Sequence, residues 1–162
     1  MAQGMKKEIA LSSVGLPVAL QELSGGREAA PEVLTPLDLA FVGDAVCSLI
    51  FRTMAAGGGA CPVEKMHQFA GRYVNAGAQS AMMRYIQPHL TEKEHHIYRR
   101  GRNSKPVTHA KNQTVTDYRR ATGYEALLGY LYLANDWDRL MELVRIGYEG
   151  YESGSKTDLK RP

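Results

Sequence analysis

The sequence predicts an all-α fold made of one helical domain. Apolar residues recur at helical spacing from about residue 35 to residue 148, and capping or helix-ending residues separate the segments. No segment alternates polar and apolar residues with the period of a strand, and there is no internal repeat. With 162 residues, 44% of them hydrophobic, the chain is long enough to build one domain with a substantial core.

The expected helices follow one another with short connections. Thr35-Pro36 begins the first helix, and the glycines at 57–59 end it. The second helix is expected from Pro62 to Val74 and the third from Asn75 to Pro88. A capping box at Thr91 and Glu94 begins the fourth, which stops at Gly101. The fifth runs from Thr114 or Thr116 to about Ala134, and the last from Asn135 or Asp136 to Tyr148. Residues 103–113 are polar and are expected to form a loop.

The two ends of the chain differ from the part between them. Residues 1–34 show no clear period, and we expect a flexible N-terminal extension with at most one short helical turn. Residues 153–162 are expected to form a polar C-terminal tail. The helical domain is therefore expected to cover residues 35–152.

Composition limits the classes of protein to which the chain could belong. The net charge of +3 is mild and does not by itself indicate a nucleic-acid partner. The longest apolar stretch, 37–51, is interrupted by Asp38 and Asp44, so we expect no membrane span, and the start of the chain lacks a signal-peptide pattern. The two cysteines, Cys47 and Cys61, are too few for a disulfide framework, which favours reduced thiols and a cytoplasmic protein.

Two isolated carboxylates are the most informative residues. Asp44 lies in the middle of a helix that is apolar on nearly every side, and Glu125 is the only charged residue between 121 and 134. Both are therefore expected to be buried, where an ionised carboxylate is costly without a cation or several donors. A Mg²⁺ ion shared by the two acids would satisfy both, because Mg²⁺ prefers oxygen ligands and few protein carboxylates. The alternative is that each acid pairs with an arginine or caps a neighbouring helix.

The positive charge is concentrated in residues 93–120. This segment holds eight basic and two acidic residues, a net charge of +6 against +3 for the whole chain. It leads directly into the helix of Glu125, so a cationic surface is expected beside the acids. Such a surface would hold a polyanion through its phosphates, and the scarcity of aromatic residues favours a duplex over a single strand. A solvated basic face with no ligand is the alternative.

Three motifs resemble those of the ribonuclease III superfamily. Residues 41–46, FVGDAV, resemble its signature helix, and residues 124–133, YEALLGYLYL, resemble its second acidic helix. Residues 100–105, RGRNSK, together with Tyr118-Arg119, are similar to those of the Mini-III ribonucleases, the branch that consists of a catalytic domain alone. The resemblance covers residues 37–148.

The resemblance implies a ribonuclease III-like catalytic domain over 35–152 with no double-stranded-RNA-binding domain. It implies a homodimeric endonuclease that cuts double-stranded RNA with Mg²⁺, leaves 5′-phosphate and 3′-hydroxyl ends, and trims precursor 23S ribosomal RNA. Asp44 and Glu125 would then be the catalytic and metal-binding residues. The residues expected to bind RNA are Arg100, Arg102, Asn103, Lys105, Lys111 and Arg119.

The sequence departs from the superfamily at two metal-site positions. Full ribonuclease III enzymes have further acids four residues before the aspartate and three before the glutamate, where this chain has Ala40 and Thr122. The implied site therefore holds at least one Mg²⁺, and Asp38 and Glu64 are the nearby acids that could join it. Two other functions compete with the nuclease: a non-catalytic RNA-binding or ribosome-assembly module of the same fold, and a helical DNA-binding protein.

Overall fold

The computed structural model describes residues 15–26, 30–104 and 114–158, and it is all-α over these residues, as the sequence predicts. The α-helices are α2 (Leu16–Leu23), α3 (Pro36–Gly57), α4 (Val63–Val74), α5 (Ala76–Ile86), α6 (Glu92–Asn103), α7 (Val115–Leu133) and α8 (Trp137–Asp158). Two 3₁₀ helices, η1 (Pro31–Val33) and η2 (Gln87–His89), complete the described part.

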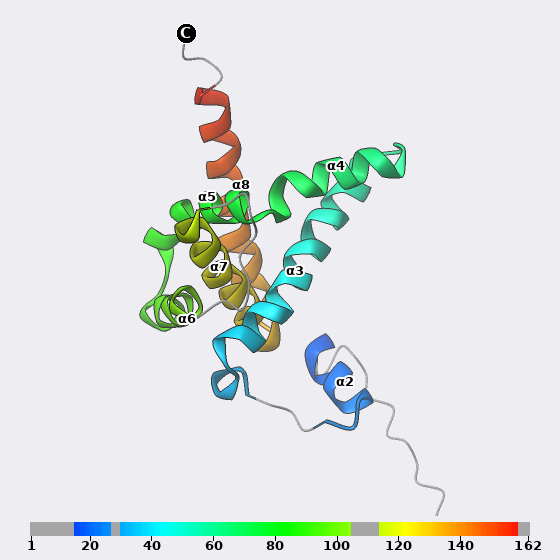
Figure 1. The fold of residues 1–162 in the computed structure, drawn as a ribbon. Coiled ribbons are helices and arrows are strands. Elements are labelled where there is room, and N and C mark those ends of the chain that lie inside the picture. Colours follow the sequence, from blue (N-terminus) through cyan, green and yellow to red (C-terminus); the bar gives the residue numbers. More distant parts are fainter. Residues whose placement is uncertain (1–14, 27–29, 105–113, 159–162) are drawn as a thin grey trace, which may run out of the picture.

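Helices α3 and α7 cross at the centre of the fold with their backbones in contact (Figure 1). A Cβ added to Gly43 of α3 would overlap the carbonyl oxygen of Glu125, and one added to Gly129 of α7 would overlap that of Leu39. Glycine inside a helix lowers its stability, and the usual reason for keeping it is a neighbouring backbone that leaves no room for a side chain. The two glycines therefore set how closely the central helices approach.

The other helices surround this crossing (Figure 1). Helices α5 and α6 pack on α7, α8 packs on α5, and α4 lies along the C-terminal half of α3. The core between them contains large, fully buried side chains: Leu39, Phe51, Tyr73, Met82, Met83, Ile86, Tyr124, Leu127, Leu128, Leu140 and Leu143. Arg139 of α8 joins α8 to the start of α6, because its guanidinium donates to both carboxylate oxygens of Glu94, at 2.8 and 2.9 Å.

Most predicted helix starts are confirmed by their caps. Thr35 and Thr91 form capping boxes with Asp38 and Glu94. The Asn75 side chain accepts from the backbone N–H of Ala78, and Thr114 caps α7. These side chains satisfy N–H groups that have no partner inside their own helix.

Three helix boundaries differ from the prediction. The N-terminal extension contains two turns of helix, α2, where at most one turn is expected. Helix α6 continues past Gly101 to Asn103, because Gly101 is a packing glycine: a Cβ there would lie 2.7 Å from that of Ala126 in α7. Helix α8 continues past the predicted end at Tyr148 and through the expected polar tail to Asp158. The predicted loop at 103–113 lies mostly outside the described residues.

Helix α3 meets the length and composition of a membrane span, contrary to the sequence-based expectation. Its best window has a mean hydropathy of 1.5. The core helix of a soluble protein meets the same criteria, and α3 packs against α4, α6 and α7. Its apolar character is therefore explained by its central position in a helical bundle.

The close crossing predicts a large effect of a single methyl group. Gly129→Ala should lower the free energy of unfolding by about 3 kcal/mol, because the new Cβ would force α3 and α7 apart. Urea unfolding followed by circular dichroism measures the change. Gly71→Ala in α4 is the matched control. A Cβ at Gly71 meets nothing within 4 Å, so the free energy of unfolding of this variant should rise by about 0.5–1 kcal/mol. Equal stability of the two variants would contradict the packing role of Gly129.

Candidate active site at the crossing of α3 and α7

The two acids singled out by the sequence meet where α3 and α7 cross. Asp44 follows Gly43 on α3, and Gly43 lies directly against the backbone of Glu125 on α7. The side chains are close enough that the charge of Asp44 acts on the Glu125 carboxyl. Two acids that are 81 residues apart in the sequence, one on each helix, thus lie at a common point.

The surroundings of Glu125 disfavour the ionised form of its carboxyl. Burial raises the pKa of its carboxyl from 4.5 to about 7, with a further contribution from the charge of Asp44. A hydrogen bond from the side chain of Gln79 acts in the opposite direction. A carboxyl that is held partly against ionisation beside a second acid is characteristic of a functional site and of a place that favours a cation.

Asp44 is exposed, which corrects the expectation that both acids are buried. The sequence pattern of α3 shows no polar face, but the helix is covered on one side only. Its exposed residues include Phe41, 83% exposed, and Leu49, 53% exposed, as well as Asp44. The cost of burial therefore falls on Glu125, while Asp44 faces solvent at the edge of the crossing.

No third acid joins the pair within the described residues. Asp38 is occupied at the start of α3, where it accepts from the Thr35 N–H and hydroxyl at 3.0 and 2.6 Å. Glu64 lies in the first turn of α4, exposed and beyond the far end of α3. Residues 15–26, 30–104 and 114–158 contain no group of three or more His, Cys, Asp or Glu side chains that could hold a metal.

The donor set is therefore two carboxylates, one exposed and one mostly buried. Such a set fits Mg²⁺, which binds through one or two carboxylates and completes its shell with water and substrate phosphate. It does not suit Zn²⁺, which prefers a closed set of nitrogen and sulfur ligands. The nearby Cys47 thiol is fully buried, and burial raises its pKa to about 12.

A buried polar cluster behind the acids escaped the sequence analysis. Gln79 of α5 is 1% exposed, and its Nε2 donates to the Sγ of Cys47 at 3.6 Å. The Tyr124 side chain, also fully buried, lies against Cys47. A signal for Gln79 exists in the sequence: it falls on the same helical line as Met82, Met83 and Ile86, where an apolar residue is expected.

The predicted RNA-binding residues that the structure describes lie on two adjacent helix ends. Arg100, Arg102 and Asn103 are on the last turns of α6, and Arg119 is on the second turn of α7. The two ends are held together where Gly101 packs against Gly123, two residues before Glu125. We call these four residues the basic surface. Lys105 and Lys111 lie outside the described residues.

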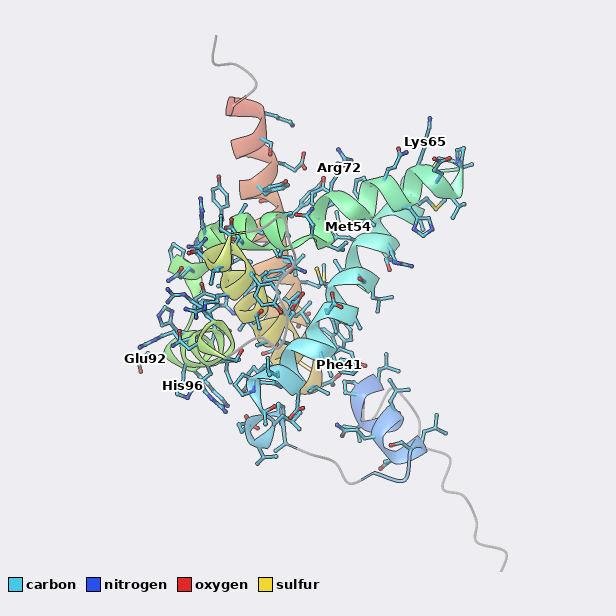
Figure 2. All side chains as sticks on the ribbon, in the orientation of Figure 1. Phe41, Met54, Lys65, Arg72, Glu92 and His96 are labelled. Atoms are coloured by element: carbon cyan, nitrogen blue, oxygen red, sulfur yellow. The ribbon has the colours of Figure 1, made fainter. Side chains whose placement is uncertain are left out.

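The basic surface has polar groups free for a ligand. Within the described ranges, no acidic side chain forms an ion pair with its three arginines. Arg100 and Asn103 line a hollow of about 550 Å³ between α6 and the start of α3, together with Arg99 and His96 (His96 is labelled in Figure 2). Arg120, by contrast, has a structural role, since it donates to Ser80 at 2.8 Å and pairs with Asp117.

Known proteins are similar to this chain in sequence and in fold. Residues 37–136 match the family model described as the ribonuclease III domain. The chain is 42% identical over 127 residues to Mini-ribonuclease 3 of Clostridium tetani, which covers 77% of this chain and 83% of that protein. It is 41% identical over 128 residues to Mini-ribonuclease 3 of Symbiobacterium thermophilum, covering 79% and 98%. A crystal structure of a Fusobacterium nucleatum protein superposes with a TM-score of 0.66 at 30% identity, covering 72% of this chain and 89% of that one.

The raised pKa of Glu125 predicts how stability depends on pH. Between about pH 4.5 and 7 the folded protein holds a proton on Glu125 that the unfolded chain releases. In metal-free buffer this residue therefore lowers the free energy of unfolding as the pH rises through that window. Glu125→Gln removes the effect, so the variant should become more stable than wild type by about 1–3 kcal/mol at pH 8.

Urea unfolding in EDTA from pH 4.5 to 8 measures this difference. Glu64→Gln, at an exposed acid, should follow the wild-type profile throughout. Excess Mg²⁺ at pH 8 should raise the free energy of unfolding of the wild type and leave that of Glu125→Gln unchanged. The reason is that the Glu125 carboxylate binds the ion and the glutamine amide does not. Parallel pH profiles for wild type and Glu125→Gln would contradict the raised pKa.

Proposed function

The chain belongs to the ribonuclease III family, in its Mini-ribonuclease 3 branch, and on this premise we propose how its residues divide the work of cutting RNA. The protein is an endoribonuclease that hydrolyses double-stranded RNA. The observation that carries the assignment of roles is the position of an acid pair at a helix crossing, flanked by a cationic surface. In our proposal the acids form the catalytic centre and the basic surface holds the duplex.

Asp44 and Glu125 are proposed to hold Mg²⁺ between them. When bound, the ion supplies a water of lowered pKa for attack on the phosphodiester and neutralises charge that develops on the phosphate. Asp44, at the exposed edge, is accessible to a ligand the size of a duplex. Glu125, mostly buried, provides a carboxylate in surroundings of low polarity, where its attraction to a cation is strong.

Arg100, Arg102, Asn103 and Arg119 are proposed to position the RNA, together with Lys105 and Lys111. Guanidinium and amide groups are common partners of phosphate and sugar oxygens, and these contacts fix the register of a duplex without reading its bases. Because Gly101 contacts Gly123, the end of α6 that carries most of the basic surface packs on α7 two residues before Glu125. A duplex held there would bring a phosphate to the acid pair.

We further propose that the active protein is a homodimer. Helix α3 contains a window of mean hydropathy 1.5, yet Phe41, Leu49 and Met54 on it are exposed. Met54, labelled with Phe41 in Figure 2, borders two hollows, one of about 630 Å³ against α4 and one of about 500 Å³ against α8. An exposed apolar face of this kind, lined with hollows, suits a second copy of the chain. The family is generally dimeric.

The cellular substrate is proposed to be precursor 23S ribosomal RNA, as the resemblance to Mini-III ribonucleases implies. We also place the protein in the cytoplasm. Its two cysteines are free, with Cys47 buried and Cys61 exposed, and exposed free thiols suit a reducing compartment.

Cleavage tests the catalytic centre directly. Asp44→Asn and Glu125→Gln should each lower the rate of Mg²⁺-dependent cleavage of duplex RNA about 100-fold or more, while binding of the duplex is retained. Mapped ends of precursor 23S ribosomal RNA should carry 5′-phosphates in the wild-type reaction only. Glu64→Gln serves as the control and should cut at the wild-type rate. Wild-type rates in folded Asp44→Asn protein would refute the site, and a wild type that binds but never cuts would indicate a non-catalytic RNA-binding module.

The dimer is tested at its most exposed apolar residue. Phe41→Glu should shift the mass measured by light scattering from twice 17.9 kDa to 17.9 kDa, because a charge cannot be buried in an apolar interface without a partner. Val33→Glu, at a valine of η1 that is 74% exposed, adds the same charge outside the exposed apolar face of α3 and should remain dimeric. A wild type that is monomeric at micromolar concentration would overturn the proposal.

A further inference from the structure

Gln79 is a buried amide with no apparent structural reason to be polar. It is 1% exposed and lies on the inner face of α5, in line with the fully buried Met82, Met83 and Ile86. A primary amide in such surroundings costs free energy unless its polar atoms find partners, and a methionine or leucine would pack there at no such cost. The partners of this amide therefore indicate what it does.

Its partners come from both helices that carry the acids. The Nε2 group of Gln79 donates to the Sγ of Cys47, which follows Asp44 by three residues on α3. The same side chain lies close enough to the carboxyl of Glu125 on α7 to lower its pKa, as a donor to the charged form does. An amide has two N–H groups, so one can serve each partner. A third helix, which itself contributes no acid, thus contacts the acid pair from behind.

The contact between the Gln79 amide and Glu125 matters for metal binding, because a carboxylate has two oxygens and each can have a different partner. Accepting from the Gln79 amide with one oxygen would fix the rotation of the carboxylate and leave the other oxygen available to a cation held with Asp44. Groups that orient a metal ligand in this way change metal affinity by about 10- to 100-fold when they are removed. The thiol of Cys47 stays protonated, because burial raises its pKa to about 12, and it gives the amide a neutral second contact.

We propose that Gln79 is the positioning residue of Glu125: its amide, anchored on Cys47, holds the Glu125 carboxylate toward Asp44 and thereby prepares the metal site. This inference rests on the proposed catalytic centre and adds to it a residue that never touches the RNA. It also gives a role to the one buried glutamine in the described core.

The test measures metal binding without RNA. Mn²⁺ replaces Mg²⁺ as the probe, and free Mn²⁺ is followed by electron paramagnetic resonance while the full-length protein is titrated. Gln79→Met keeps the size and helix preference of the side chain and removes both N–H donors. We expect its Mn²⁺ affinity to fall at least 10-fold. In cleavage assays kcat at fixed Mg²⁺ should fall by a similar factor with little change in KM for the duplex, and a higher Mg²⁺ concentration should restore part of the loss.

Ser80→Ala is the matched control. Ser80 is the next residue of α5, fully buried, and bonded to Asp117 and Arg120 rather than to the acid pair. Its loss should lower the melting temperature but leave Mn²⁺ affinity at the wild-type value. A purely structural role of Gln79 would instead make Gln79→Met behave like Ser80→Ala.

The outcomes separate this inference from the proposed catalytic centre. A folded Gln79→Met protein with wild-type Mn²⁺ affinity would overturn the role of Gln79 alone. A wild type that binds no Mn²⁺ at millimolar concentration would overturn the metal site and the role of Gln79 together. Should Gln79→Met not fold, Gln79→Asn decides, because its amide is one methylene too short to reach Cys47 and Glu125 at once: weakened Mn²⁺ binding supports the role, and wild-type binding overturns it.

Discussion

The crossing of α3 and α7 in backbone contact is the constraint on which the site depends. Gly43 and Gly129 leave no space between the two helices, so each glycine meets a carbonyl oxygen of the opposite helix. Because Asp44 adjoins Gly43 and Glu125 supplies one of those carbonyls, the same contact that closes the core also sets the spacing of the acids. The proposed catalytic centre is therefore a direct product of core packing, and it lies on helices rather than on loops.

The environment of the two acids differs even though both lie at one crossing. Asp44 faces solvent, whereas Glu125 is mostly buried and its carboxyl is held with a pKa of about 7. This difference creates a local electrostatic cost that a cation relieves. Gln79 reduces this cost as an N–H donor, and the end of α6 that carries most of the basic surface packs on α7 two residues before Glu125. Ligand binding and protein stability are thus coupled at this point.

The outer side of α3 is the part of the fold that the single chain leaves incomplete. A central helix normally buries its whole surface, but one face of α3 exposes Phe41 and Leu49 to solvent. Asp44 lies on this exposed part, so whatever covers the apolar residues also approaches the acid pair. The geometry links the proposed assembly of two chains to the proposed chemistry.

The sequence by itself determined the all-α class and the starts of the helices from α3 to α7, and it singled out Asp44 and Glu125 as candidates, because caps, helical periodicity and isolated charges are local signals. Only the tertiary structure decided that Asp44 is exposed, that Gly101 packs against α7 rather than ending α6, and that Gln79 contacts both acid-bearing helices. Burial and contact between helices depend on which faces meet. A helix that is apolar on every side, as α3 is, carries no information about which of its faces will be covered.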